Sequence, residues 1–140
     1  MLKGIPPILS PELLKILMEM GHGDEIVIGD GNFPAASLAK RLVRLDGHGV
    51  PEILDAVLAL MPLDTYVAEP AALMATTNGD PEPEIWKIYE QIVEKREPGK
   101  KIGFEERFAF YERTKKAYAV IATGETAVYA NIILKKGVVK

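Results

Sequence analysis

A histidine and an aspartate stand at the two ends of one short apolar run. His22 is one of two histidines in the 140-residue chain, and it lies between Gly21 and Gly23. The apolar run at residues 26–28 predicts a buried strand, and Asp30 follows shortly after it. Histidine exchanges protons near neutral pH, and the flanking glycines let other groups approach it closely. Because ligands of open α/β sheets bind at strand ends, this stretch is the first candidate for a site of proton transfer.

A structural interpretation of the same residues is also open. His22 follows an apolar helix pattern, and an imidazole there favours the negative end of the helix dipole. Gly21 suits the position just after a helix, and an aspartate after a strand is a common turn residue. From these residues alone, the catalytic and the structural interpretations weigh equally.

The motifs of several enzyme classes are absent. The sequence contains no glycine-rich nucleotide pattern and no Gly-x-Ser-x-Gly nucleophile motif. Two histidines without cysteine make a poor zinc site. What remains is a small polar set that suits an uncharged ligand with several hydroxyl groups and proton transfer without covalent chemistry. Its members are His22, Asp24, Asp30, Arg107, Tyr118, Tyr129 and Asn131.

Helical and strand patterns alternate along most of the chain. Apolar residues at helical spacing predict helices over residues 10–20, 50–61, 80–97 and 105–116, with a short helical turn at 35–41. Ser10 and Asp80 are expected to cap the first and third of these helices. Short apolar runs predict strands at residues 26–28, 42–45, 71–76, 102–104, 117–123 and 129–137.

This alternation predicts a layered α/β fold with a mostly parallel sheet. The last two predicted strands follow each other closely, so we expect them to pair and to form an antiparallel portion. The final strand either joins the interior of the sheet or serves an interface between subunits.

Composition narrows the class of protein. The chain is 48% apolar and 26% charged with a net charge of −3, which is typical of one soluble globular domain over residues 1–140. No basic stripe favours nucleic acid, and no apolar run approaches the roughly 20 residues of a membrane span. Cysteine is absent, which fits a reducing compartment. We therefore expect a cytoplasmic protein without a nucleic-acid or membrane partner.

Six segments in a fixed order carry a resemblance to a known family. They are Ser-Pro-Glu-Leu-Leu-Lys (10–15), Glu-Met-Gly-His-Gly-Asp-Glu-Ile (19–26), Asp30 with Phe33-Pro34, Arg-Phe-Ala-Phe-Tyr-Glu-Arg (107–113), Thr-Gly-Glu (123–125) and Tyr-Ala-Asn-Ile-Ile-Leu-Lys-Lys-Gly-Val (129–138). Over residues 1–138 the chain resembles the RbsD/FucU family, which contains L-fucose mutarotase and D-ribose pyranase. Gly23 and Arg107 match the fucose branch, whereas Gly31-Asn32 departs from the Ala-His that is common there.

The resemblance implies a fold and an activity. The fold would be a three-layer α/β/α arrangement with a mixed, mostly parallel sheet. The activity would be the interconversion of the α and β anomers of free L-fucose, which makes the protein an isomerase of carbohydrate metabolism. No metal and no cofactor are implied. The family forms ring-shaped decamers whose sites are completed by neighbouring subunits, so the expected partners are a free monosaccharide and further copies of the chain.

The resemblance also assigns roles to individual residues. The proton donor would be His22, and the sugar contacts would be Asp30, Arg107, Tyr129, Ala130 and Asn131. From the chemistry we expect Asp24 or Asp30 to set the tautomer of His22 or to hold a sugar hydroxyl. Arg107 and Tyr129 would stabilise charge that develops on the sugar oxygens. Tyr118 is expected to join the substrate-binding set.

Three alternatives stay open at this point. The same site would serve another free sugar, chiefly by pyranose–furanose conversion of ribose. A second possibility is a protein that binds sugar without turning it over. The third is a structural role, in which His22 caps a helix and the final strand serves assembly. The contact for the methyl group of a 6-deoxy sugar is also open among Phe33, Phe108 and Tyr111.

Overall fold

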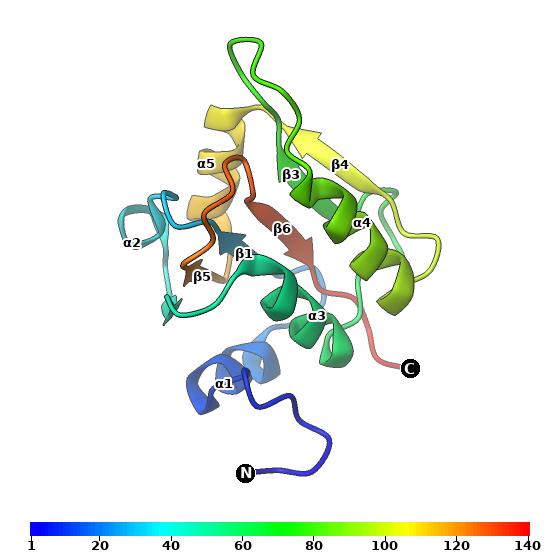
Figure 1. Cartoon of the computed structure of the whole chain (residues 1–140). Helices are drawn as coiled ribbons and strands as arrows, with labels where there is room; N and C mark the ends of the chain where they lie inside the picture. Colours follow the sequence, from blue (N-terminus) through cyan, green and yellow to red (C-terminus); the bar gives the residue numbers. More distant parts are fainter.

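The apolar runs of the sequence form a single six-stranded sheet in the computed structural model, which describes all 140 residues (Figure 1). The strands are β1 (Glu25–Gly29), β2 (Leu42–Leu45), β3 (Ala71–Met74), β4 (Ile102–Glu105), β5 (Ala119–Thr123) and β6 (Ile132–Lys135). The helices are α1 (Pro11–Glu19), α2 (Ala35–Leu38), α3 (Val50–Leu60), α4 (Ile85–Arg96) and α5 (Arg107–Lys116).

The strands lie in the order β2-β5-β1-β6-β3-β4. The β1–β5, β2–β5 and β3–β4 pairs are parallel, and β6 runs antiparallel to both of its neighbours, β1 and β3. Five strands therefore point the same way. We call the end of the sheet at which β1 to β5 finish the carboxyl edge, and the opposite end the amino edge.

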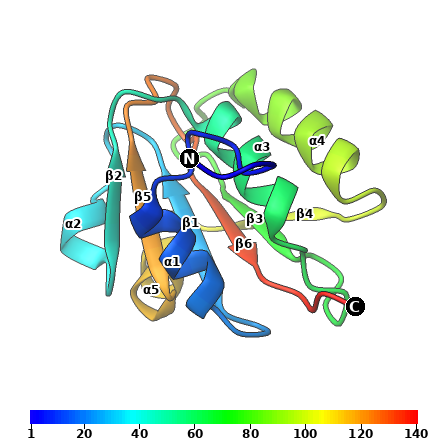
Figure 2. The same cartoon turned by 90° about the horizontal axis from the view of Figure 1, so that it is seen from below.

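Side chains alternate between the two faces of each strand and build two cores. On β1, Ile26 and Ile28 pack into a large core together with α1, α3 and α4. Val27 points the other way and packs with Phe33, near α2, and with Phe110 of α5. Figure 2 shows helices on both sides of the sheet. The predicted three-layer α/β/α fold with a mixed, mostly parallel sheet is confirmed.

One predicted pairing is wrong. β5 and β6 do not pair, because β1 lies between them in the sheet. Residues 124–131 connect the two strands, which is long enough for the chain to cross the end of β1. Ile132, Ile133 and Leu134 are fully buried, as expected for a central strand with both faces covered. The final strand thus belongs to the interior of the sheet.

Two helix ends also differ from the prediction. α1 finishes at Glu19, and Met20 is already extended, so Gly21 does not act as a left-handed cap. α4 begins only at Ile85, with Glu84 in the N-cap position. Asp80 is therefore not a helix cap, and its carboxylate is free for another partner.

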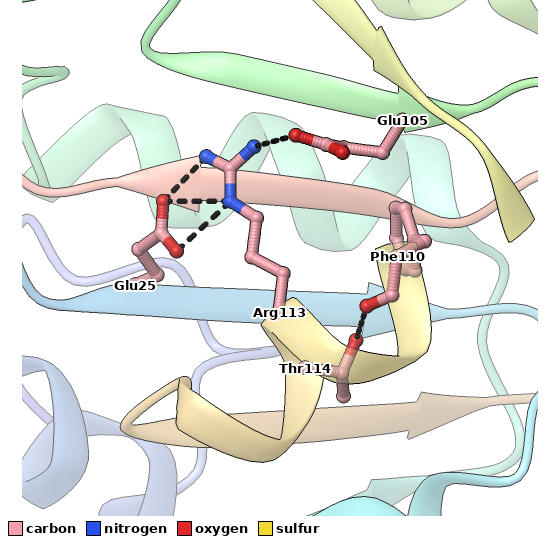
Figure 3. A network of polar contacts seen from close by, with 5 residues as sticks. All are labelled: Glu25, Glu105, Phe110, Arg113 and Thr114. Carbon is pink, nitrogen blue, oxygen red and sulfur yellow. Dashed lines mark hydrogen bonds and ion pairs between the residues drawn. The ribbon is translucent and has the colours of Figure 1, made fainter. Parts of the chain in front are cut away.

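α5 carries few apolar side chains and is fastened to the sheet by an ion-pair network. Only Phe110 and Thr114 of this helix are buried. The Nε of Arg113 donates to both carboxylate oxygens of Glu25, at 3.0 and 3.1 Å, and its Nη1 donates to Glu105 at 3.2 Å (Figure 3). The carboxylates stand on β1 and β4, so one guanidinium ties α5 to two strands. This anchor fixes the helix whose first residue is Arg107.

Candidate active site

The predicted site residues divide into two groups at opposite edges of the sheet. Asp30, Arg107 and the segment 129–131 lie at the carboxyl edge, where β1 and β4 finish and β6 begins. His22 and Tyr118 lie at the amino edge, before β1 and β5. β1 runs between the two groups, and its five residues separate them by roughly 15 Å. One chain therefore does not bring all of the predicted residues together.

The carboxyl edge holds a pocket of about 480 Å³, a size that suits a small ligand. Its polar lining comes from strand ends and loops and consists of Asp30, Asn32, Thr77, Asp80, Arg107, Tyr129 and Asn131. Its apolar lining consists of Phe33, Met74, Pro81, Tyr111 and Val128. Polar groups that converge from several elements onto apolar walls are typical of a binding site for a neutral, hydroxyl-rich molecule.

Asp30 is the most buried carboxylate of this pocket. Its side chain accepts from the backbone N–H of Asn32 at 3.0 Å and of Ala130 at 3.3 Å, and its own N–H donates to Oδ1 of Asn131 at 2.7 Å. Burial raises the pKa of Asp30, and the backbone donors oppose that rise. Gly29 allows Phe33 to fold back against this strand end, since a Cβ there would lie 2.7 Å from the Phe33 ring.

The segment 129–131 is held in place by two aromatic residues of α4. Nε1 of Trp86 donates to the carbonyl of Tyr129, and Oη of Tyr89 donates to the carbonyl of Ala130, both at 2.8 Å. Tyr129 has a positive φ of 52°, which is unusual for a residue other than glycine and is common at functional sites. Sequence reasoning did not identify Trp86 as a residue that supports the pocket.

Arg107 stands at the first turn of α5 among aromatic rings. Its Nε donates to Oη of Tyr111 at 3.1 Å, and its guanidinium lies 5.3 Å from the Phe108 ring. Tyr111 also contacts Phe33 edge-on, with ring centroids 5.9 Å apart. Phe33 and Tyr111 line the pocket, whereas Phe108 does not and is 64% exposed. Of these three rings, Phe33 and Tyr111 are the two that line the pocket within one chain.

At the amino edge, His22 is paired with a carboxylate that sequence reasoning missed. Its Nε2 lies 2.9 Å from Oδ1 of Asp64, a residue in the α3–β3 loop that is only 4% exposed. The hydrogen bond from His22 lowers the pKa of Asp64, and the N–H of Tyr66, at 3.1 Å, adds to this. The Tyr66 ring lies 5.2 Å from the imidazole. Asp64 is 42 residues from His22, so no local pattern could have paired them.

This geometry corrects the expected partners of His22. The Asp24 carboxylate accepts from the N–H of Gly21 at 2.8 Å, and Asp30 lies at the other edge, so within the chain neither sets the tautomer of His22. An ionised Asp64 accepts from Nε2, which leaves Nδ1 as the nitrogen free for proton transfer. The helix-capping interpretation also fails, because the imidazole bonds to Asp64 and not to a helix carbonyl.

Tyr118 is engaged at the amino edge as well. Its hydroxyl donates to Glu19 at 2.8 Å, and the guanidinium of Arg41 lies 3.8 Å above its ring. The amino edge therefore presents a paired imidazole and a second aromatic group, whereas the carboxyl edge presents a polar pocket. No three metal-ligating side chains gather anywhere in the chain.

Fold and site together define a class, namely α/β proteins with a pocket for a small hydroxylated ligand at the carboxyl ends of parallel strands. The comparisons with known proteins make this specific. The RbsD / FucU transport protein family matches residues 3–139, and the chain belongs to this family.

Named relatives agree with this assignment. The chain is 53% identical over 144 aligned positions to the fucose mutarotase of Homo sapiens, covering 98% of this chain and 94% of the relative. A crystal structure of the fucose mutarotase from Streptococcus pneumoniae in complex with L-fucose superposes with a TM-score of 0.95 at 56% identity, covering 99% of this chain and 100% of that one. Bacillus subtilis RbsD complexed with D-ribose is more distant, with a TM-score of 0.72 and 27% identity over 94% of this chain and 95% of that one.

A membrane span requires a helix of sufficient length and apolar composition. None of the five helices is long and apolar enough to cross a bilayer.

Proposed function

We propose that the protein interconverts the α and β anomers of free L-fucose, and that His22 and the pocket at the carboxyl edge carry out the reaction. The fucose mutarotase activity itself rests on the near-complete match to a fucose mutarotase whose structure contains L-fucose. The same match favours fucose over ribose, because the ribose-bound relative is 27% identical and the fucose-bound relative is 56% identical.

The chemistry needs one acid and one base. A proton is placed on the ring oxygen while the proton of the anomeric hydroxyl is removed, and the C1–O5 bond breaks to give the open-chain aldehyde. The C1–C2 bond then rotates, and reversal of the two proton transfers closes the ring on the other face. Positioned acid–base groups give roughly 10²–10⁴-fold acceleration, which is sufficient for a reaction that already proceeds slowly in water.

The residues take the following roles in this proposal. His22 exchanges its proton with the sugar through Nδ1, because Asp64 holds Nε2 at 2.9 Å. Donation to the ring oxygen takes place from the imidazolium, which carries a proton on both nitrogens, and leaves the neutral ring with its remaining proton on Nε2. Asp30, with its raised pKa, accepts the proton of the anomeric hydroxyl or holds that hydroxyl. Arg107 stabilises negative charge that develops on the sugar oxygens. Tyr129 and Asn131 form the wall at the start of β6.

The separation of His22 from the pocket supports an assembly in which neighbouring subunits share each site. We propose a homo-oligomer, with a decameric ring as the expected form, in which the amino edge of one subunit covers the pocket of the next. An apolar groove near the amino edge supports such a contact. It includes Leu2, Met18 and Val139, each of which is at least 69% exposed in the single chain.

Subunit mixing tests the shared site. His22→Ala and Arg107→Ala proteins are each expected to be nearly inactive. When the two are dissociated and reassembled together in equal amounts, about a quarter of the sites should contain both an intact histidine and an intact arginine. Recovery of about a quarter of wild-type activity supports the proposal. No recovery, in mixtures shown by native mass spectrometry to contain both variants, contradicts it.

A sugar panel tests the substrate. NMR saturation transfer between anomeric protons is measured for L-fucose, D-galactose and D-ribose with the same amount of protein. We expect the largest acceleration for L-fucose. A larger acceleration for ribose would move the protein to the ribose branch, and binding without acceleration of any sugar would leave a sugar-binding protein.

We place this activity in the cytoplasm, which suits a chain without cysteine.

A further inference from the structure

A loop between β3 and α4 forms part of the pocket lining and is held there by the side chain of Tyr129. The loop covers residues 75–84 and rises above β3 and α4 (Figure 1). Two of its polar residues, Thr77 and Asp80, line the pocket together with Tyr129. The hydroxyl of Tyr129 donates to Oδ2 of Asp80 at 2.6 Å and lies 3.0 Å from Oγ1 of Thr77.

The direction of each hydrogen bond follows from the chemistry of the groups. A carboxylate only accepts, so the Tyr129 proton points to Asp80. The hydroxyl of Thr77 must then donate to the Tyr129 oxygen. The chain of bonds runs from Thr77 through Tyr129 to Asp80 and fixes the orientation of the carboxylate. The other carboxylate oxygen of Asp80, Oδ1, has no hydrogen-bond partner in the protein.

The backbone of the loop is shaped to place Asp80 there. Asn78 and Gly79 both have positive φ, at 55° and 74°, and the N–H of Asp80 donates to the carbonyl of Thr77 at 2.9 Å. These are the features of a type I′ turn, which reverses the chain within four residues. Because α4 starts five residues later, at Ile85, the Asp80 side chain is not used as a helix cap.

We propose that Asp80 is a further sugar-binding residue of this pocket, a second carboxylate besides Asp30. Its Oδ1 would accept a hydrogen bond from a sugar hydroxyl. The inference rests on the proposed function, since it takes the pocket to bind a free monosaccharide. Asp30 stands at the end of β1 and Asp80 on the β3–α4 loop, so the two carboxylates approach the ligand from different elements. Hydrogen bonds between carboxylates and hydroxyls are short and strong, which makes such a residue a determinant of which sugar hydroxyls must be present.

The test combines variants of Asp80 with sugars that each lack one hydroxyl. Dissociation constants are measured by calorimetry for L-fucose and for its 1-, 2-, 3- and 4-deoxy analogues, with wild-type, Asp80→Ala and Asp80→Asn proteins. Glu82→Gln is the matched control, because Glu82 lies exposed in the same loop and makes no hydrogen bond. Thermal unfolding of each variant reports the integrity of the loop.

For L-fucose we expect Asp80→Ala to weaken binding about 10-fold or more and Asp80→Asn to weaken it less, since the amide keeps an acceptor oxygen. For one of the four deoxy analogues the weakening should disappear, because that sugar lacks the hydroxyl that Asp80 contacts. Glu82→Gln should bind as the wild type does.

Unchanged fucose affinity in Asp80→Ala, or an equal loss for all five sugars, would overturn the proposal, since an equal loss marks a collapsed loop and not a lost contact. If Asp80→Ala does not fold, Asp80→Asn gives the same comparison at a smaller amplitude. Wild-type protein that does not bind L-fucose would overturn the proposed function and this inference with it. If the wild type binds L-fucose and Asp80→Ala binds it with the same affinity, only the role of Asp80 is overturned.

Discussion

Replacing Asp64 tests whether the carboxylate behind His22 is part of the machinery. Oδ1 of Asp64 accepts from both Nε2 of His22 and the N–H of Tyr66, at 2.9 and 3.1 Å. Asp64→Asn keeps the shape and one acceptor oxygen but removes the charge. Asp64→Ala removes both hydrogen bonds and leaves the imidazole free to rotate. Asp64 does not touch the sugar in this account, so it is a positioning residue.

The magnitude follows from the two kinds of hydrogen bond. A hydrogen bond to a charged group contributes about 1.5–3 kcal/mol and one between neutral groups about 0.5–1.5 kcal/mol, so the exchange for asparagine removes about 1–2 kcal/mol. At 1.36 kcal/mol for each factor of ten, Asp64→Asn should slow anomer exchange about 5- to 30-fold. Asp64→Ala removes the whole interaction and should slow it by about 10- to 150-fold.

The assay is saturation transfer between the anomeric protons of L-fucose at fixed protein concentration. The ¹⁵N spectrum of the histidines gives a second readout, because Asp64 favours the form of His22 that is protonated at Nε2 and asparagine weakens that preference. Asp46→Asn is the control, since Asp46 is an exposed carboxylate that pairs with Arg44 at 3.0 Å. An Asp64→Ala variant with wild-type activity, or a larger loss in Asp24→Asn than in Asp64→Asn, would refute the reasoning.

Three further predictions concern the pocket and the stability of the fold. Arg107→Lys should raise the fucose dissociation constant about 10-fold, measured by calorimetry, because lysine cannot reproduce the planar guanidinium; unchanged affinity would remove Arg107 from the pocket chemistry. Tyr89→Phe should lower the free energy of unfolding by about 1–3 kcal/mol in urea titration, since it leaves the buried carbonyl of Ala130 without its 2.8 Å donor; a stable variant would show that water replaces the donor. The ion pair with Arg96 lowers the pKa of Asp55 from 3.8 to about 2, so it stabilises the fold above about pH 4 and this stabilisation is lost as the pH falls toward 2. Asp55→Asn should therefore reduce the loss of unfolding free energy between about pH 4 and pH 2 by about 1 kcal/mol or less, as expected for a partly exposed pair. An unchanged pH dependence of the unfolding free energy would show that the pair contributes nothing.

Much of the fold could be predicted because its signals are local. Apolar periodicity located all six strands and the main helices, and Ser10 caps α1 as its side chain predicts, by accepting from the N–H of Leu13. Strand order was not accessible in this way. Pairing depends on which faces are buried in three dimensions, and Ile132–Lys135 reads as an apolar run whether it pairs with β5 or inserts beside β1.

The site residues show the same contrast between local signals, which the sequence carries, and long-range contacts, which it does not. Asp30 and Asn131 were named from residue type and position, and the structure brings them into one pocket with a 2.7 Å hydrogen bond. Asp64 and Asp80 were missed because their partners are 42 and 49 residues away in sequence. Asp80 was in addition misread as a helix cap, since Asp-Pro-Glu is a strong helix-start pattern that here precedes α4 by several residues.

The most direct measurement is the rate of anomer exchange of L-fucose with wild-type protein and with His22→Ala, by NMR saturation transfer. The account predicts fast exchange with catalytic amounts of the wild type and a loss of at least about 100-fold in the variant, with the assembled protein and its fucose affinity largely retained. Exchange in His22→Ala at the wild-type rate would contradict the role of His22. Background exchange with the wild type itself would contradict the mutarotase function.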